Sequence, residues 1–405
     1  MSDDLCFTPA TRLAEEIRAR RLSPVDVVDA VLRRIERLEP SLNAFVTVTR
    51  EEARQAAIEA DAAVRRGDRL GPLHGVPFSV KDLVTTAGVR TTFGSRLYEG
   101  FVPTEDGVAV RRLKAAGAIL LGKTTTPEFG HKAVTDAPLF GITRNPWDRS
   151  RTPGGSSGGA AAAVAAGMGP LGVGTDGGGS IRIPAACCGI VGLKPTLGTV
   201  PHGQPPDLFG TVSYVGPMTR TVADAALMLA VMAGPDEADP HSLGRTPDDY
   251  VGAATAGRLE GLRIAWMPTV GNRAVDREVK ALCEEAVRRL ERAGAHVETT
   301  EVDLTRCEAI FLTLSRATNF SRFGDRLPEW RDRLDASLVD SIEKGRDLTA
   351  ADLARALFAR SDVYRQVQGL FRRYDLLATP TLSAPPPPAG RSALEPIEVE
   401  GKPAG

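Results

Sequence analysis

The segment from Pro153 to Pro195 reads PGGSSGGAAAAVAAGMGPLGVGTDGGGSIRIPAACCGIVGLKP. It places two serine sites, Ser156–Ser157 and Ser180, among glycines. Glycine loses more backbone freedom on folding than any other residue, so such a segment is typical of backbone that turns sharply or approaches a ligand closely. Serine hydroxyls beside bare backbone N–H groups indicate acyl-transfer chemistry, with a nucleophile next to an oxyanion site. The alternative is a tight loop under a helix, with the serines as helix caps.

Length and charge limit the fold and the partners. The chain has 405 residues, of which 25% are charged, and a net charge of −1. This length fits one large α/β domain or two ordinary ones. No basic run interleaved with aromatic residues is present, which argues against nucleic acid as a partner.

The cysteines and the apolar runs limit the compartment. The five cysteines show no CxxC pattern and no Cys/His spacing, so we expect no metal. The weakly polar run from Gly158 to Thr175 is mostly alanine and glycine, and it is too short and too weakly apolar to span a membrane. The N-terminus is acidic and polar and lacks a signal-peptide pattern. We therefore expect a protein of the reducing cytoplasm, without a membrane partner.

Predicted helices and strands alternate along the chain. Ser23-Pro24 is a helix start, with serine as the cap, and Pro40 is expected to end that helix. Helices are predicted at 8–38, 50–66, 108–116, 158–166, 221–232, 276–292 and over most of 305–372. Strands are predicted at 75–82, 118–122, 171–175, 262–266, from 297 and at 374–379. This alternation predicts an α/β fold, a sheet with helices on its faces.

Lys81 ends the predicted strand GVPFSVKD at 75–82. A lysine at a strand end is usually a solvated edge charge. The functional alternative is a desolvated lysine, because burial disfavours the ammonium form and leaves a neutral amine that can act as a base.

Three motif interpretations compete for the glycine-rich segment. The GxGxxG match at Gly172–Gly177 lacks the long helix and the following acid that a dinucleotide site needs. The GxSxG match at Gly154–Gly158 resembles a nucleophile elbow, but that elbow needs a strand directly before it, and Pro146 and Pro153 argue against a central strand there. The third interpretation joins both serine sites with Lys81, since a serine nucleophile needs a proton acceptor and no histidine lies near either serine in the sequence.

At this point the chain closely resembles the amidase signature family. The matching segments are GPLHGVPFSVKD (71–82), GKTTTPEFG (122–130), GITRNPWDRSRTPGGSSGG (141–159), GTDGGGSIRIPAACCGIVGLKPT (174–196) and VGPMTRTVADAALML (215–229). The resemblance covers nearly the whole chain and weakens after about residue 240. It implies the amidase signature fold, a central mixed β-sheet covered by helices on both faces.

The resemblance also implies a Ser–Ser–Lys triad. Lys81 matches the family's base, Ser156 the bridging serine, which follows a cis peptide in the family, and Ser180 the nucleophile. Three glycines match the oxyanion hole: Gly177, Gly178 and Gly179. The implied reaction is hydrolysis of a carboxylic amide through an acyl-enzyme, and it requires no metal and no cofactor. Asp176 and Arg182 flank the turn, and we interpret them as structural supports of the loop.

The chain departs from the family pattern at two places. Many relatives carry Thr or Ile where this chain has Gly177, which is expected to loosen or open the oxyanion loop. Relatives also usually continue, after DLLATPTLSAPPPP, with segments that complete the sheet and line the pocket, and these do not occur here. We therefore expect this chain to be less stable than its longer relatives.

The resemblance implies one domain over 1–405. Its parts are an N-terminal helical layer at 1–68, a signature core with the triad at 69–235, and a C-terminal α/β part at 236–405. The expected partner is a small-molecule amide, and a homodimer is one option. Two alternatives to a general amidase stay open: the glutaminase component of a tRNA-dependent amidotransferase, and an inactive relative that serves as a binding scaffold.

Overall fold

A computed structural model describes residues 4–272 and 274–403 of the protein. The chain divides into two compact units, Met1–Ala256 with Pro386–Arg391, and Gly257–Pro385 with Ser392–Gly405. Each unit is described by itself below. The expectation of one domain with three parts stays a prediction.

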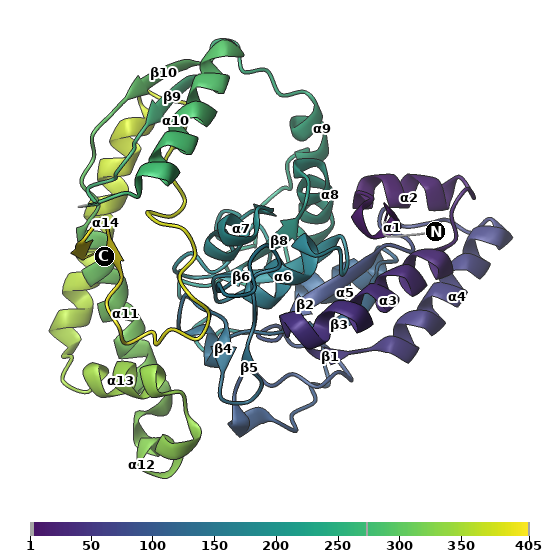
Figure 1. Cartoon of the computed structure of the whole chain (residues 1–405), viewed down its shortest axis with the longest axis horizontal. Helices are drawn as coiled ribbons and strands as arrows, with labels where there is room; N and C mark the ends of the chain where they lie inside the picture. The colour runs from purple at the N-terminus through teal and green to yellow at the C-terminus, as the bar shows by residue number, and fades with distance from the viewer. Residues whose placement is uncertain (1–3, 273, 404–405) are drawn as a thin grey trace. The chain divides into compact units, whose positions relative to one another are not determined.

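The first unit is built on a six-stranded sheet in the order β1-β3-β2-β6-β8-β7 (Figure 1). Its strands are β1 Phe45–Val48, β2 Pro77–Lys81, β3 Ile119–Thr124, β6 Leu171–Asp176, β7 Val191–Gly192 and β8 Tyr214–Thr219. Strands β3, β2 and β6 run parallel, whereas β1, β8 and β7 run antiparallel to their neighbours. The predicted mixed sheet is therefore confirmed. A two-stranded sheet joins β4 Asp136–Ala137 to β5 Gly141–Ile142.

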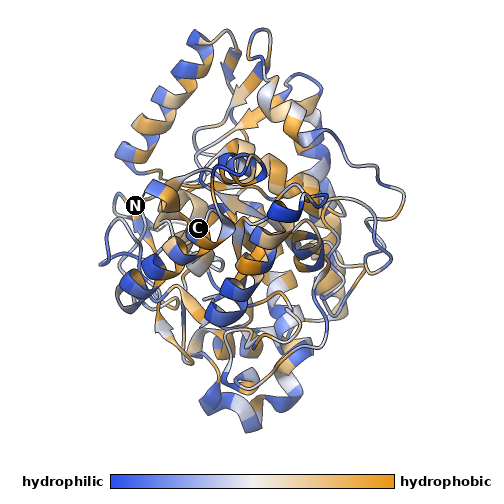
Figure 2. Cartoon of the chain, turned by 90° about the vertical axis from the view of Figure 1, so that its right-hand side faces the viewer, coloured by the Kyte–Doolittle hydropathy of each residue, from blue (hydrophilic) through white to orange (hydrophobic). Residues whose placement is uncertain are grey.

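Helices bury apolar residues on both faces of this sheet. One buried cluster joins Phe78 and Val80 of β2 to three helices: α2 Ala10–Arg18, α5 Val108–Ala115 and α8 Val222–Met232. A second cluster joins Ile119 and Leu121 of β3 to α3 Pro24–Leu42, α4 Arg50–Arg66 and α6 Gly158–Ala165. Because side chains alternate across a strand, neighbouring strands supply both clusters. Helices with hydrophilic residues along one side and hydrophobic residues along the other are visible in Figure 2. The short helices of this unit are α1 Asp4–Phe7, α7 Arg182–Cys188 and α9 Tyr250–Thr255.

Helix α3 shows where local sequence signals hold and where they fail. The Ser23 side chain accepts a hydrogen bond from the Val25 N–H, and Pro24 occupies the first helical position, as predicted. The predicted stop at Pro40 is wrong, because the helix continues to Leu42 and ends at Asn43 in the left-handed conformation. A proline this close to the end removes only one hydrogen bond of the last turn, so the helix tolerates it.

The second unit contains a parallel three-stranded sheet in the order β10-β9-β11. Its strands are β9 Arg263–Trp266, β10 His296–Thr299 and β11 Leu376–Ala378. Its longer helices are α10 Arg277–Arg292, α11 Arg306–Phe323, α13 Ala336–Gly345 and α14 Ala350–Phe371, with the short α12 at Leu327–Trp330. The hairpin of β12 Glu398–Val399 and β13 Lys402–Pro403 lies where the sequence predicts no pattern. Within the described residues, no helix has both the length and the apolar character that a membrane span requires.

Candidate active site

Lys81 ends strand β2 and is fully buried. Its Nζ lies 2.6 Å from Ser156 Oγ, 2.8 Å from Thr175 Oγ1 and 3.3 Å from the Thr175 carbonyl oxygen. Strand β6, which carries Thr175, is the parallel neighbour of β2, so the sheet itself fixes this group. The structure therefore brings together Lys81 and Ser156, two residues that lie far apart in the sequence.

Burial holds the pKa of Lys81 well below its usual value of 10.5, and the charge of Asp176 opposes this shift only in part. A second buried lysine provides a comparison. Lys123 on β3 lies 3.9 Å from the carboxylate of Asp82, and the pKa of Lys123 falls only to about 8, lowered by burial and raised again by Asp82. Lys81 has no carboxylate within ion-pair distance among the described residues. The environment of Lys81 thus favours a neutral amine.

The two serine sites are joined through backbone and hydroxyl contacts. The Ser157 N–H donates to the Ser180 carbonyl oxygen at 3.1 Å. The Ser157 hydroxyl donates to the Thr175 carbonyl oxygen at 3.1 Å and accepts from the Thr175 N–H at 3.3 Å. The Gly155–Ser156 peptide bond is cis, which agrees with the family pattern. Ser156 and Ser180 therefore belong to two loops that are held against the same strand.

Close packing accounts for the small residues that follow Ser157. A Cβ atom at Gly158 would lie 2.2 Å from Thr135 Oγ1, and one at Gly159 would lie 2.3 Å from Thr125 Oγ1. Helix α6 is buried, so larger side chains would have no room. The glycines here therefore allow a close approach between backbone elements.

Asp176 organises the turn at the end of β6. Its Oδ1 accepts hydrogen bonds from the Gly179 N–H at 2.8 Å and from Arg182 Nη2 at 2.8 Å. Its Oδ2 accepts from the Ile181 N–H at 3.0 Å and from Arg182 Nε at 2.9 Å. Burial alone would raise the pKa of Asp176, but these hydrogen bonds outweigh it and hold the pKa below 3.8. The predicted role of Asp176 and Arg182 as supports of the loop is confirmed.

The three predicted oxyanion glycines have different environments. Gly177 and Gly178 are exposed, and within the described part of the chain neither N–H has a turn or loop hydrogen bond. Gly179 is buried with φ +113°, a conformation that favours glycine, and its N–H is occupied by Asp176. A Cβ atom at Gly177 would lie 2.5 Å from the Val212 carbonyl oxygen, so this position needs glycine because a neighbouring loop lies against it.

Ser180 is half-buried at the end of this turn. Its carbonyl oxygen is bound by Ser157, whereas no hydrogen bond joins Ser180 Oγ to Ser156 Oγ in the described residues. Catalytic hydrogen bonds are often long without substrate and tighten once it binds. The structure thus places Ser180 beside the Lys81–Ser156 pair, with the serine hydroxyls not yet joined.

Sequence reasoning missed three residues of this site. Thr175 holds Lys81 Nζ with both of its oxygens, and Ser157 joins the two serine loops. Gly130 lies against Ser156, since a Cβ atom there would come within 3.2 Å of Ser156 Oγ. Only Ser157 carried a signal, as the neighbour of Ser156. The other two are brought in by the sheet and by a distant loop.

The nucleophile-elbow interpretation of Gly154–Gly158 is wrong. The nearest preceding strand in the described residues, β5, ends at Ile142, so no strand leads directly into Ser156. The partner of Ser156 Oγ is Lys81 rather than a histidine.

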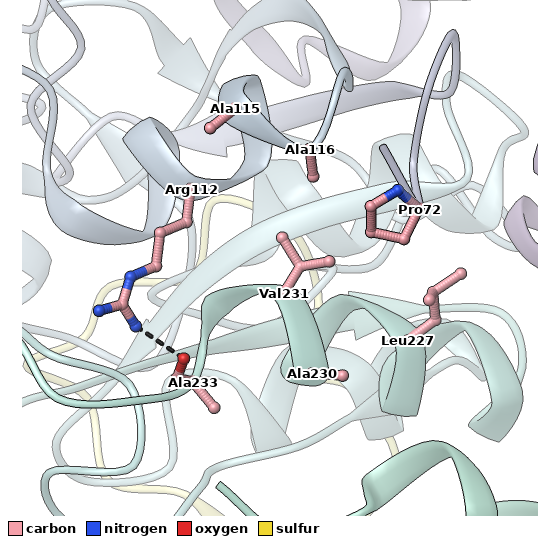
Figure 3. A pocket seen from close by; sticks show the side chains of 8 residues that line it. All are labelled: Pro72, Arg112, Ala115, Ala116, Leu227, Ala230, Val231 and Ala233. Atoms are coloured by element: carbon pink, nitrogen blue, oxygen red, sulfur yellow. Dashed lines mark hydrogen bonds between the residues drawn. The ribbon is translucent and has the colours of Figure 1, made fainter. Parts of the chain in front are cut away.

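A cavity of about 490 Å³ lies apart from these residues (Figure 3). It is lined by Pro72, Arg112, Ala115, Ala116, Leu227, Ala230, Val231 and Ala233, none of them predicted site residues. Its one charged side chain, Arg112, donates to the carbonyl oxygens of Met232, Ala233 and Gly234 at the end of α8. That guanidinium is committed to the helix end, so the cavity offers no polar group for catalysis. Within the described residues, no cluster of His, Cys, Asp or Glu side chains is arranged to hold a metal.

Comparisons with known proteins agree with this geometry. The sequence profile of the Amidase family matches residues 26–401. The chain is 42% identical to an acylamidase of Rhodococcus erythropolis, over 94% of this chain and 80% of that protein. It is 36% identical to the first (A) component of the glutamyl-tRNA(Gln) amidotransferase of Carboxydothermus hydrogenoformans, over 98% of this chain and 87% of that protein. The crystal structure of a bacterial aryl acylamidase superposes with a TM-score of 0.91 at 32% identity, over 98% of this chain and 84% of that one. The chain therefore belongs to the amidase signature family and is an amidase, a hydrolase of linear amides.

Proposed function

We propose that this amidase works through an acyl-enzyme on Ser180, with Ser156 and Lys81 as its proton relay. The observation that carries the proposal is the 2.6 Å contact between Lys81 Nζ and Ser156 Oγ, made by a buried lysine whose pKa is well below its usual value. A serine nucleophile needs a proton acceptor, and this pair supplies one without histidine.

The hydrogen-bonding capacity of Lys81 supports the neutral form. The Thr175 carbonyl oxygen can only accept, so a Lys81 N–H donates to it. A neutral amine keeps one lone pair, and the Ser156 hydroxyl lies at the right distance to donate to it. Ser156 oxygen can then accept the proton of Ser180, which defines the direction of the relay.

In the proposed reaction, Ser180 Oγ gives its proton to Ser156 as Ser156 gives its own to Lys81. Ser180 Oγ forms a bond to the amide carbonyl carbon, and a tetrahedral oxyanion results. The relay returns the proton to the leaving nitrogen, the C–N bond breaks, and ammonia or an amine departs. Water then loses a proton to the same relay and attacks the ester, which releases the acid and restores Ser180.

The oxyanion hole is proposed at the turn of Gly177, Gly178 and Gly179, with one refinement. Because the Gly179 N–H already donates to Asp176, we assign the donors to the N–H groups of Gly177, Gly178 and Ser180. Gly179 contributes its left-handed conformation instead. Loss of one such donor typically costs about 3–4 kcal/mol of transition-state stabilisation.

The test is intact-protein mass after treatment with a fluorophosphonate probe. We expect one adduct on the wild type and on the control Ser150→Ala, which removes an exposed serine, and none on Ser180→Ala. Lys81→Met is expected to label far more slowly. An adduct that persists in Ser180→Ala, or a folded wild type that takes up none, would overturn the proposed role of Ser180.

A second candidate follows from the relatives named as components of glutamyl-tRNA(Gln) amidotransferases. In that case the chain would act as the glutaminase component of a larger enzyme. Hydrolysis of simple amides by the isolated chain favours the general amidase. Glutamine hydrolysis that rises only when a partner protein and charged tRNA are added favours the amidotransferase component.

A further inference from the structure

Charged side chains border the 177–180 turn on the side of strand β8. Asp176 and Tyr214 are direct partners in the β6–β8 pairing, and direct cross-strand partners project from the same face of a sheet. Arg182 binds Asp176, and Lys194 Nζ lies 3.7 Å from the centre of the Tyr214 ring. This group, defined here as the turn cluster, therefore combines two cations, one carboxylate and one aromatic ring.

The carboxylate of the turn cluster is already in use. Both oxygens of Asp176 accept from Arg182, and they also accept from the backbone N–H groups of Gly179 and Ile181. One carboxylate thus balances one guanidinium and fixes the turn. The turn cluster is left with one positive charge in excess, and that charge belongs to Lys194.

Lys194 has no ion-pair partner of its own. In the described part of the chain, no carboxylate lies within 4.0 Å of its Nζ, and the side chain is half-buried. Its one hydrogen bond runs to the carbonyl oxygen of Pro195 at 2.9 Å, although an ammonium group has three N–H donors. The Tyr214 face attracts the ammonium but leaves its charge uncompensated. Burial and the charge of Arg182 both lower the pKa of Lys194, which reflects the same lack of a counter-charge.

The register of the sheet places Lys194 near the reacting end. Strand β7 runs antiparallel to β8, and the pairing continues from Gly192 opposite Met218 to the Leu193 N–H, which donates to Pro217. Lys194 follows next along this edge, and its side chain reaches Tyr214 at the first position of β8. That position lies opposite the last residue of β6, directly before the exposed Gly177 and Gly178. The ring itself is fixed by a hydrogen bond from Tyr214 Oη to the Thr211 carbonyl oxygen at 3.0 Å.

We propose that Lys194, held on the Tyr214 ring, is an anion subsite that binds a carboxylate carried on the acyl part of the amide substrate. The acyl side follows because the turn receives the acyl carbonyl. This inference rests on the proposed function, and it names a substrate class: amides whose acyl chain ends in a carboxylate. The ammonium supplies two unused donors and the missing charge balance, and such a charge-assisted bond is stronger than a neutral one.

The test compares matched substrates. Succinamate, glutaramate and adipamate carry a terminal carboxylate, whereas butyramide, valeramide and hexanamide carry a methyl group at the same position. Ammonia release gives kcat/KM for each pair in the wild type, in Lys194→Met, in Lys194→Arg and in the control Lys114→Met. Lys114 lies on α5 and pairs with Asp106, away from the turn cluster. The same amides are also tested as competitors of fluorophosphonate labelling, which requires no turnover.

For at least one chain length, we expect the wild type to prefer the carboxylate substrate. Lys194→Met is expected to lower that preference by about 10- to 100-fold, mainly through KM, as expected for loss of one charge-assisted hydrogen bond. Lys194→Arg and Lys114→Met should retain most of the preference. The ratio between paired substrates corrects for general damage, because both members of a pair use the same serine.

Three outcomes would overturn the inference. The first is a wild type that hydrolyses the neutral amides without any preference for the carboxylates. The second is a preference that survives Lys194→Met. Either result leaves the Ser180 chemistry intact. The third is a wild type that neither turns over nor is protected by any carboxylate amide; if Ser180 also fails to label, the proposed function fails with it.

Discussion

The charge state of Lys81 can be tested by replacing it with methionine, which has a similar length and no titrating group. A lysine whose pKa is lowered on folding binds its proton more readily in the unfolded chain. Stability must therefore rise with pH between the lowered pKa and the ordinary value of 10.5. One proton taken up on unfolding corresponds to about 1.4 kcal/mol per pH unit.

If Lys81 is neutral from pH 7 to pH 9, the wild type should gain about 2.7 kcal/mol relative to Lys81→Met over that range. The methionine also leaves Ser156 Oγ and Thr175 Oγ1 without their nitrogen partner, but that penalty does not change with pH and cancels in the comparison of slopes. Urea unfolding at pH 7, 8 and 9 measures both profiles. Parallel profiles would mean that Lys81 is charged in the folded protein, and the proposed base would be lost. The variant should also lose about 10²- to 10⁴-fold in kcat.

Three further predictions concern the turn and helix α3. Asp176→Asn removes the charge that Arg182 and the turn N–H groups share, so we expect a loss of about 2–3 kcal/mol in urea unfolding and a lower kcat; unchanged values for both would contradict the assigned support role. Gly177→Ala places a Cβ atom 2.5 Å from the Val212 carbonyl oxygen, and we expect about 1–3 kcal/mol of destabilisation, seen as a lower melting temperature, whereas an unchanged midpoint would show that this loop yields freely. Burial raises the pKa of Glu39 from 4.5 to about 7 against the hydrogen bonds from Phe45 and Ala44, so the folded protein binds the proton more tightly and stability should fall by about 3 kcal/mol as pH rises from 4.5 to above 7. Glu39→Gln should flatten this fall in urea midpoints taken across that range, and an equal slope in both proteins would refute it.

Local signals in the sequence predicted most of the elements of the first unit. Ser23-Pro24 predicted the start of α3, and the charged, alanine-rich stretch predicted α4 over Arg50–Arg66. The end of α3 was missed because a proline is judged as a helix breaker, whereas its actual cost depends on how many hydrogen bonds remain to be lost. The separate three-stranded sheet and the hairpin near residue 400 depend on pairings between short segments that carry no periodic signal of their own.

The site divides in the same way. Glycine and serine spacing, with the family resemblance, led to Lys81, Ser156 and Ser180, and the structure brings their loops together. Sequence could not show that Thr175 would hold the lysine, since a threonine on a strand is ordinary until its neighbouring strand is known. Nor could it show that Asp176 would occupy the Gly179 N–H, because a hydrogen bond inside a turn depends on conformation rather than on residue type.

The contacts of Ser157 have a consequence for how this enzyme can change over time. Its backbone and hydroxyl tie the Ser180 loop and strand β6 to the segment that carries Ser156, and all of these residues belong to the unit that ends at Ala256. The distances of the proton relay are thus set within one folded body. Substitutions between Gly257 and Pro385 can accumulate without altering those distances. Mutational drift in the second unit is therefore decoupled from the relay chemistry, which leaves that half of the chain open to evolutionary variation while the reaction type stays constant.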